Sequence, residues 1–206
     1  MRNSCHFTMS LFSLVACTAL GAAGCAGGAD DAASADPAAA SDGVVHRTIV
    51  QVAPDGSVQP AYETITVAQQ QAELAARAAL VDAMRNGQDQ PEALASLHSD
   101  GGCAGADLWL FDQANLAGNE LCLFKAATDD AAWLDLGTMC RGFLCLGRWS
   151  AAVHSLWAGS DPGSLQSCTN TLCFATPFLN FTAFQRFDSV APGGVHPLNW
   201  AFLFTP

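Results

Sequence analysis

The sequence predicts a small, mainly β domain at residues 103–206 that disulfides hold together. Short apolar segments alternate there with turn signals, a spacing typical of the strands of a sandwich or barrel. This part of the chain has all five Trp and ten of the twelve Phe residues, so a core must form here. It also contains six cysteines, namely Cys103, Cys122, Cys140, Cys145, Cys168 and Cys173. A domain of about 100 residues buries a limited share of its surface, and disulfides are a common supplement.

Residues 1–24 have the features of a signal peptide. Arg2 precedes an apolar run from Leu11 to Ala23, and small residues end this run before Gly24. The run is shorter than the roughly 20 residues that a membrane-spanning helix needs. We therefore expect a leader that is removed on export.

Cys25 follows the small residues directly, and the segment resembles the lipobox of bacterial lipoproteins. The resemblance implies a mature chain that begins at Cys25 and is anchored in a membrane by acyl chains on that residue. Two alternatives stay open: a rival lipobox that ends at Cys17, and an ordinary secretory signal with a coincidental cysteine. Ala26 follows Cys25 directly, without an acidic residue at that position, and this resembles lipoproteins that are sorted onward to an outer membrane. We expect an outer membrane lipoprotein of the cell envelope whose domain faces either the periplasm or the cell surface.

Cleavage before Cys25 leaves six downstream cysteines, an even number as a disulfide framework needs. Thiols are oxidised outside the inner membrane, so disulfides persist there. CxxxxC spacing favours the local pairs Cys140–Cys145 and Cys168–Cys173, which would leave Cys103–Cys122. A zinc site is disfavoured because zinc ribbons use CxxC knuckles and reduced thiolates.

Two predicted segments precede the β domain. Residues 25–43 are mostly small, polar or acidic, which predicts a disordered acidic tether. Residues 44–52 are β-rich, and the turn signal at residues 53–56 is followed by a second short strand near residues 57–59. This hairpin could join the main domain or form a separate appendage.

Residues 66–98 predict two helices that act as a stalk, so that the hairpin and the stalk together occupy residues 44–102. Thr66 and Gln69 match a capping box, and residues 68–85 are good helix formers. The apolar stripe of this helix is narrow, which favours an exposed or loosely docked position. A shorter helix is expected at residues 89–98.

Residues 111–118, Phe-Asp-Gln-Ala-Asn-Leu-Ala-Gly, resemble the folded hairpin of the βγ-crystallins. Trp149 and Ser155 stand where that family places its Trp and the Ser that closes the hairpin. The resemblance covers residues 108–157 and implies a Greek-key sandwich, in which Phe111 covers the hairpin and Gly118 adopts a positive φ. A second repeat is not evident in residues 160–206.

The resemblance also bears on ligands and activity. Ser150 and Ala151 stand where the family supplies carboxylate or carboxamide oxygens, and calcium needs hard oxygen ligands. We therefore expect weak or no calcium binding, no other metal and no cofactor. Relatives of this fold include small secreted metalloproteinase inhibitors, which supply a second functional hypothesis.

The remaining features exclude several function classes. The net charge of −11 disfavours nucleic-acid binding. The sequence has no HExxH, GxSxG or nucleotide-binding pattern, so we expect no enzymatic activity. Phenylalanines recur every three or four residues from Phe174 to Phe187; they could complete the core or form a patch for a protein or glycan. We expect a non-enzymatic, lipid-anchored envelope protein with a βγ-crystallin-like binding or structural module, and a metalloproteinase inhibitor is the alternative.

Overall fold

The computed structural model describes residues 43–53, 55, 57–86, 102–125, 131–169, 172–173, 179–190 and 198–204, with the backbone alone at 169, 172 and 173. These residues all belong to one unit, which spans residues 38–206. The predicted signal peptide, Cys25, nearly all of the predicted tether and the helix predicted at residues 89–98 lie outside the described residues. Within the described ranges, no helix combines the length and the apolar character that a bilayer span requires.

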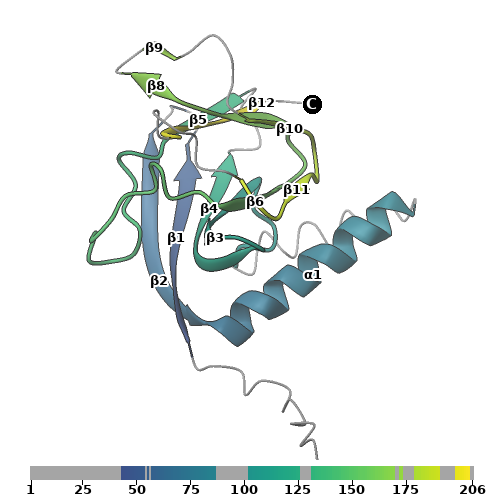
Figure 1. Cartoon of the computed structure of the whole chain (residues 1–206). Helices are drawn as coiled ribbons and strands as arrows, with labels where there is room; N and C mark the ends of the chain where they lie inside the picture. Colours follow the sequence, from purple (N-terminus) through teal and green to yellow (C-terminus); the bar gives the residue numbers. More distant parts are fainter. Residues whose placement is uncertain are drawn as a thin grey trace, which may run out of the picture. The chain divides into compact units, whose positions relative to one another are not determined.

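One helix and twelve strands form the described part of the chain (Figure 1). The helix is α1 (Val67–Arg85). The strands are β1 (Val44–Val52), β2 (Val58–Thr66), β3 (Leu108–Gln113), β4 (Ala117–Lys125), β5 (Ala131–Asp135), β6 (Ser155–Ala158), β7 (Gly163–Gln166), β8 (Cys168–Thr169), β9 (Leu172–Cys173), β10 (Leu179–Phe181), β11 (Arg186–Phe187) and β12 (Trp200–Phe204).

The strands form two main sheets. The first has six strands in the order β11-β6-β3-β4-β1-β2, and the second has four in the order β10-β7-β12-β5. β8 and β9 form a separate two-stranded ribbon. β1 pairs with β2 in antiparallel and with β4 in parallel register, so the predicted hairpin belongs to the main sheet and is not an appendage.

Two groups of four strands follow the same path through these sheets. In the first group, β3, β4 and β6 lie in the six-stranded sheet while β5 crosses to the other one. In the second group, β7, β10 and β12 lie in the four-stranded sheet while β11 crosses back and pairs with β6. The fourth strand of each group returns beside its first, β6 beside β3 and β12 beside β7. The sequence does not reveal the second group because β10 has three residues and β11 has two, too few to show a periodic pattern.

The main core lies between the two sheets. Leu108 and Leu110 of β3 and Leu123 of β4 pack in one cluster with Leu165 of β7 and Leu203 of β12, all of them buried. Side chains alternate between the two faces of a strand, so the residues between these leucines face the other way. The burial of both faces of β3 explains why its apolar run is continuous.

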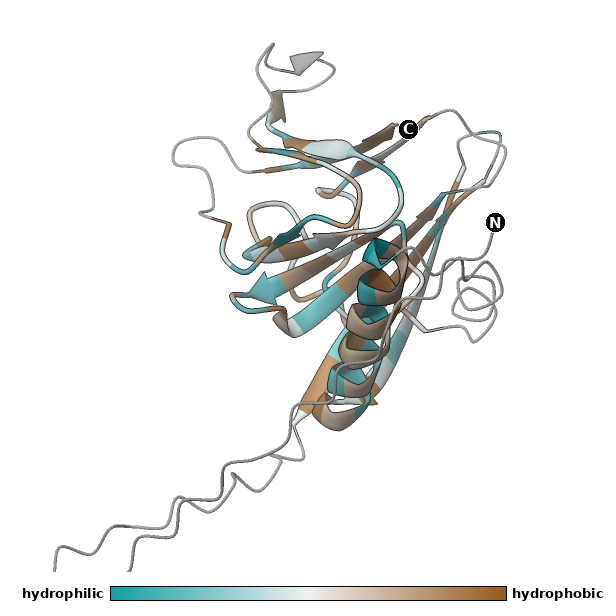
Figure 2. Ribbon diagram, turned by 90° about the vertical axis from the view of Figure 1, so that its right-hand side faces the viewer, coloured by the Kyte–Doolittle hydropathy of each residue, from teal (hydrophilic) through white to brown (hydrophobic). Residues whose placement is uncertain are grey.

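A second cluster lies between the six-stranded sheet and α1. Trp109 and Phe111 contribute from the sheet, and Leu74 and Val81 contribute from the helix. Figure 2 shows α1 against this sheet, with teal and brown residues alternating along its turns. The predicted capping box at the start of the helix is present.

The packing of α1 differs from the expected stalk. Its buried side chains are Gln70, Leu74, Arg77, Leu80 and Val81. Two of these five are polar, so the apolar stripe alone underestimates the buried face of the helix. The helix is therefore docked on the β domain and supplies polar groups to its interior.

Candidate functional site

The hairpin between β3 and β4 brings together three of the residues that the resemblance singled out. Phe111 is fully buried and packs in the same cluster as Leu116. Gly118 has φ 81°, and a Cβ at this position would overlap the carboxylate of Asp112. Ser155 Oγ accepts a hydrogen bond from the backbone N–H of Leu116 at 3.0 Å and donates one to the carbonyl of Gln113 at 2.6 Å. The serine on β6 thus closes the hairpin.

Trp149, the fourth of these residues, lies in the core between the sheets. Its side chain is fully buried, and its Nε1 lies 3.4 Å from Thr48 Oγ1. The next two residues use their backbone amides to brace the loop, because Ser150 donates to the carbonyl of Leu136 and Ala151 donates to that of Leu198. Weak or absent calcium binding at Ser150 and Ala151 stays a prediction.

Two disulfides with the predicted pairing are present. Cys103–Cys122 joins the chain after α1 to β4, and Cys140–Cys145 closes a short loop after β5. Cys168 is also disulfide-bonded, and its backbone faces that of Cys173 in the β8–β9 ribbon. The side chain of Cys173 lies outside the described residues, so this third pairing stays a prediction.

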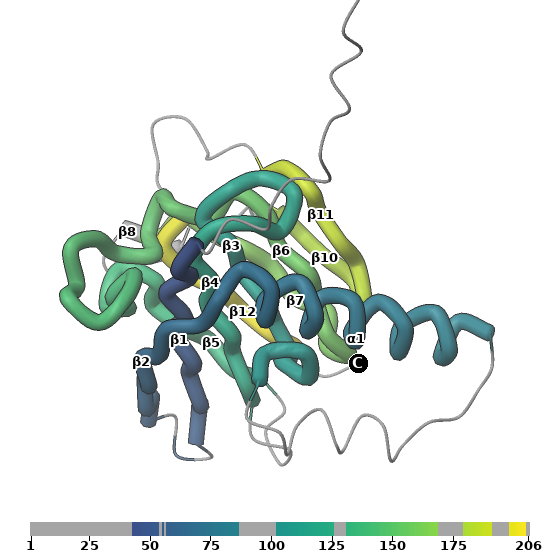
Figure 3. Tube along the Cα trace, turned by 90° about the horizontal axis from the view of Figure 1, so that it is seen from below, coloured from purple at the N-terminus to yellow at the C-terminus, as the bar shows by residue number. Residues whose placement is uncertain are grey.

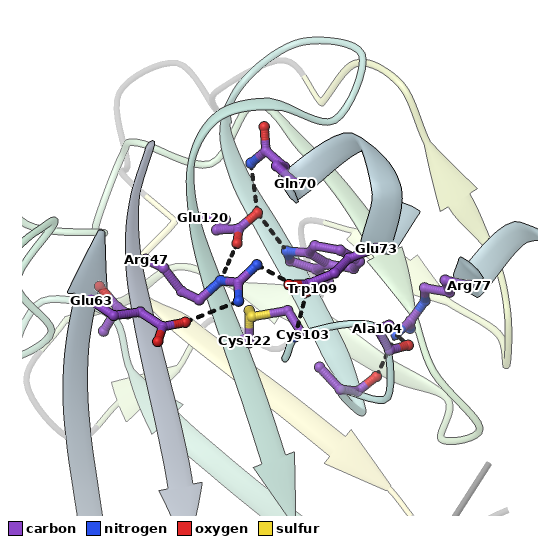
Figure 4. The surroundings of a disulfide bond; sticks show 12 residues. Arg47, Glu63, Gln70, Glu73, Arg77, Cys103, Ala104, Trp109, Glu120 and Cys122 are labelled. Atoms are coloured by element: carbon purple, nitrogen blue, oxygen red, sulfur yellow. Dashed lines mark hydrogen bonds and ion pairs between the residues drawn. A yellow bond between two sulfur atoms is a disulfide. The ribbon is translucent and has the colours of Figure 1, made fainter. Parts of the chain in front are cut away.

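A buried ion-pair network centred on Arg47 lies beside the Cys103–Cys122 disulfide (Figure 4). The guanidinium of Arg47 forms an ion pair with Glu120 and lies 2.9 Å from carboxylate oxygens of both Glu63 and Glu73. Arg47 is 2 % exposed and Glu120 is fully buried. The network joins β1, β2, β4 and α1, and single-residue patterns in the sequence do not reveal it.

Further donors satisfy the carboxylate of Glu120. Gln70 Nε2 donates to it at 2.5 Å, and the indole N–H of Trp109 donates at 3.2 Å. Burial raises the pKa of Glu120, while the charge of Arg47 lowers it and only partly offsets that effect. Burial alone would lower the pKa of Arg47, but the charges of Glu120 and Glu73 raise it above its ordinary value. The side chains of this network bind one another, which indicates a structural role.

Glu120 of the network and the two cysteines of the neighbouring disulfide, Cys103 and Cys122, form the one group of possible metal ligands found within the described ranges. Their ligand atoms lie within 4.8 Å of one another. Both sulfurs are consumed by the disulfide, and thiolates are the form in which cysteine binds metals. This group is therefore a disulfide beside a carboxylate.

Arg77 is a second buried cation, placed between two tryptophans. Its guanidinium carbon lies 5.8 Å from the ring centroid of Trp109 and 5.4 Å from that of Trp157. It donates hydrogen bonds to the carbonyls of Ala104, Ala106 and Trp157. Burial lowers the pKa of Arg77 to about 10, so the side chain stays charged at neutral pH. Cation–π contacts and backbone acceptors stabilise this charge and fix α1 on the sheet.

The loop closed by Cys140–Cys145 has the opposite character, because it exposes large apolar side chains. Phe143 is 79 % exposed, Leu144 is 73 % exposed and Leu146 is 88 % exposed. We call residues 140–148, with these three side chains, the loop surface. It appears in green, on the side of β2 in both Figure 1 and Figure 3.

Backbone contacts constrain the conformation of the loop surface, although its large side chains are exposed. Cys140 and Arg148 form an isolated antiparallel bridge, and the backbone N–H of Arg141 donates to the carbonyl of Gly147. Thr48 Oγ1 on β1 donates to the carbonyl of Cys140 at 3.0 Å. Trp149 follows directly and is anchored in the core. These contacts fix the two ends of the loop and leave its three large apolar side chains exposed.

A pocket of about 630 Å³ lies between the loop surface and the β1–β2 hairpin. Its lining mixes polar and apolar groups and includes His46, Tyr62, Asn119, Arg141, Phe143 and Leu146. Gly142 of the loop lies close to β1. It has φ 92°, and a Cβ on it would lie 3.2 Å from Cβ of His46. The loop surface and this pocket are the candidate binding site of the described chain.

The phenylalanine series between residues 174 and 187 does not form this site. Phe181 is 3 % exposed and belongs to the main core. Phe184 and Phe187 are partly buried against the two core clusters. Phe174 and Phe178 lie outside the described residues. Residues 143–146, Phe-Leu-Cys-Leu, were a better signal for the exposed patch than the phenylalanine series. They overlap the loop between Cys140 and Cys145, and so short a loop cannot bury its own side chains.

Comparisons with protein-family models, with curated proteins and with solved structures found no match to this chain.

Proposed function

We propose that this chain is a non-enzymatic, lipid-anchored protein of the cell envelope that displays a βγ-crystallin-like binding module. The lipobox-like segment before Cys25 supports the anchor. Disulfides in the β domain are consistent with an oxidising compartment outside the cytoplasm.

The strand order supports the βγ-crystallin-like fold. A Greek key brings its fourth strand back beside its first. β6 lies beside β3 and β12 lies beside β7, which supports a Greek-key path for each group. The hairpin geometry adds to this support, since Gly118 has the positive φ that the resemblance implies and Ser155 closes the hairpin.

The binding function rests on one observation, the exposure of Phe143, Leu144 and Leu146 on a constrained loop beside a pocket. Soluble proteins rarely expose contiguous apolar patches unless the patch contacts something. Of the other exposed large apolar side chains in the described residues, Val44 lies apart, whereas Trp133 and Phe204 lie with the partly buried Phe202 on the outer face of the four-stranded sheet. We propose that the lipid anchor on Cys25 is the first contact of this protein with the envelope and that the loop surface binds a component of the envelope as the second.

Cell fractionation tests the envelope anchor. After a high-salt and alkaline carbonate wash that removes non-lipidated, loop-bound chain, the wild-type chain is expected in the membrane fraction and Cys25→Ser in the soluble fraction. Cys17→Ser is the matched control, because it removes the rival lipobox and leaves Cys25 intact. Release by Cys17→Ser with retention by Cys25→Ser would assign the lipid to Cys17. Membrane retention of both variants would contradict a lipid anchor.

A metalloproteinase inhibitor is the second candidate, and the loop surface also favours it. A disulfide-closed loop that presents Phe143 and Leu144 has the rigid, protruding shape that lets a protein inhibitor enter a protease cleft. Titration of a panel of secreted metalloproteases tests it. Inhibition at a one-to-one ratio, lost in Phe143→Gly/Leu144→Gly, would favour the inhibitor, and no inhibition across the panel would remove this candidate.

A further inference from the structure

Two of the four Lys and Arg side chains of the described chain that are not buried lie at the loop surface. Seven Lys and Arg residues follow Cys25. Arg47 and Arg77 are buried, and the side chain of Lys125 is 8 % exposed in an ion pair with Asp161. Of the four that remain, Arg141 and Arg148 flank the three apolar side chains of the loop surface. In a chain with a net charge of −11, these two arginines place positive charge beside the exposed apolar side chains, and Arg141 also pairs with Asp112.

Both arginines are held in place beside the apolar tips. Arg148 is exposed and donates to the carbonyl of Thr138 at 2.7 Å, while Arg141 lines the pocket and lies 3.5 Å from Asp112. Apolar side chains at the tip with arginines at the base are the arrangement that suits a membrane interface. There the tips enter the acyl region and the cations stay at the level of the headgroups.

The loop surface also lies close to the point where the chain from Cys25 enters the domain. Gly142 packs against His46, which is two residues from Val44, the first residue of β1. Val44 is itself 61 % exposed. Eighteen residues separate Cys25 from Val44, so the chain between them can span at most about 68 Å. An acyl anchor on Cys25 would thus keep the loop surface within reach of the bilayer.

We propose that the loop surface inserts into an anionic phospholipid bilayer, with Phe143, Leu144 and Leu146 in the acyl region and Arg141 and Arg148 at the headgroup phosphates. This inference deepens the proposed function, since lipidation of Cys25 would place the domain at a membrane. The insertion itself does not need the acyl chains. Each of the three side chains is more than 70 % exposed, so most of its apolar surface is free to enter a bilayer, although all three also line the pocket beside the loop.

Vesicle flotation tests the insertion without the lipid anchor. The probe is the mature chain, residues 25–206, with Cys25→Ser, mixed with vesicles of phosphatidylcholine alone or of phosphatidylcholine with phosphatidylglycerol. We expect flotation with the anionic vesicles and several-fold weaker binding to the neutral ones, and added salt should weaken the preference. Phe143→Ser/Leu144→Ser/Leu146→Ser should bind about tenfold more weakly or worse, because less apolar surface enters the interface.

Phe204→Ser is the matched control. Phe204 is also exposed, at 44 %. It pairs with Ala131, the first residue of β5, whereas the loop surface follows the last residue of that strand. This variant should float like the wild type, and circular dichroism of each variant checks its fold. No flotation of the wild-type probe with either vesicle would overturn the inference, even if the triple variant fails to fold. Sedimentation with isolated peptidoglycan, or complex formation with one envelope protein, in place of flotation would also overturn it. The Cys25→Ser fractionation is independent, so a soluble Cys25→Ser variant without vesicle binding would leave the lipid anchor intact.

Discussion

Arg47 on β1 and Glu120 on β4 stand at facing positions of the parallel strand pair, and their side chains form a buried ion pair. Parallel pairing with β4 brings the β1–β2 hairpin into the six-stranded sheet. The ion pair lies on the side of the sheet that α1 covers, where Gln70 also binds Glu120. The hairpin, the sheet and the helix are therefore joined by one buried polar network.

Removal of Arg47 should strongly destabilise the domain. Arg47→Met leaves the carboxylate of Glu120 buried without its cation, and breaking a buried pair in this way costs about 3–5 kcal/mol. Arg85→Met is the control, because the Arg85–Asp82 pair is exposed and such pairs contribute about 0.5 kcal/mol. Urea denaturation of both variants measures the difference, and equal losses would contradict the role of the Arg47 network.

The pKa of Glu120 predicts how this contribution depends on pH. Burial raises this pKa above its ordinary value of 4.5, so the folded protein holds the proton more tightly than the unfolded chain. The carboxyl therefore contributes stability that is full below pH 4.5 and is lost as the pH rises through the folded-state pKa. We expect the unfolding free energy of the wild type, minus that of Glu120→Gln, to fall as the pH rises through the folded-state pKa. Urea titrations at several pH values measure it, and a difference that grows with pH would show that the folded state lowers this pKa.

The β3–β4 hairpin should be sensitive to small changes. Gly118→Ala places a Cβ at φ 81° against Asp112, and we expect a loss of about 1–3 kcal/mol in the free energy of unfolding. Ser155→Ala should cost a similar amount, because the buried N–H of Leu116 loses its acceptor. Gly137→Ala is the control, since its Cβ would meet only the side chain of Asp135. Thermal melts that rank Gly137→Ala with Gly118→Ala would contradict this account of the hairpin.

The two described disulfides should differ in their effect on stability. Cys103–Cys122 closes a separation of 19 residues and Cys140–Cys145 closes one of 5. In the chain-entropy description, loss of the first costs about 3 kcal/mol and loss of the second about 2 kcal/mol. Cys140→Ser/Cys145→Ser should also weaken vesicle binding, because the loop surface loses its closure. A double-serine variant of this loop that binds vesicles as tightly as the wild type would show that the disulfide does not organise the surface.

Features that depend on neighbours in the sequence could be predicted. The capping box at Thr66 and Gln69, the helix up to Arg85 and the strand that includes Phe111 all rest on local propensity or spacing. The short CxxxxC spacing likewise favoured Cys140–Cys145, since two cysteines so close in the chain meet easily. These features can be recognised in a single sequence because neighbouring residues determine them and the tertiary contacts favour the same local structure.

Apart from the Cys103–Cys122 pairing and the Ser155 closure of the hairpin, features that depend on distant segments could not be predicted. Arg47 and Glu120 lie 73 residues apart, and nothing in either segment indicates a parallel pairing. The docking of α1 was missed because Gln70 and Arg77 are polar, and their burial is compensated only by partners on other elements. The exposure of Phe143 and Leu144 is also a tertiary property. It arises because Trp149 and the Cys140–Cys145 closure fix the loop outside the core.

Mass spectrometry of the N-terminal peptide, taken from protein extracted from bacterial membranes, tests the central claim most directly. A membrane-anchored binding module requires acyl chains on the first residue of the mature chain. We predict a peptide that begins at Cys25 and has the added mass of acyl groups on that residue. An unmodified N-terminus at or after Cys25 would contradict the lipid anchor and the envelope function built on it.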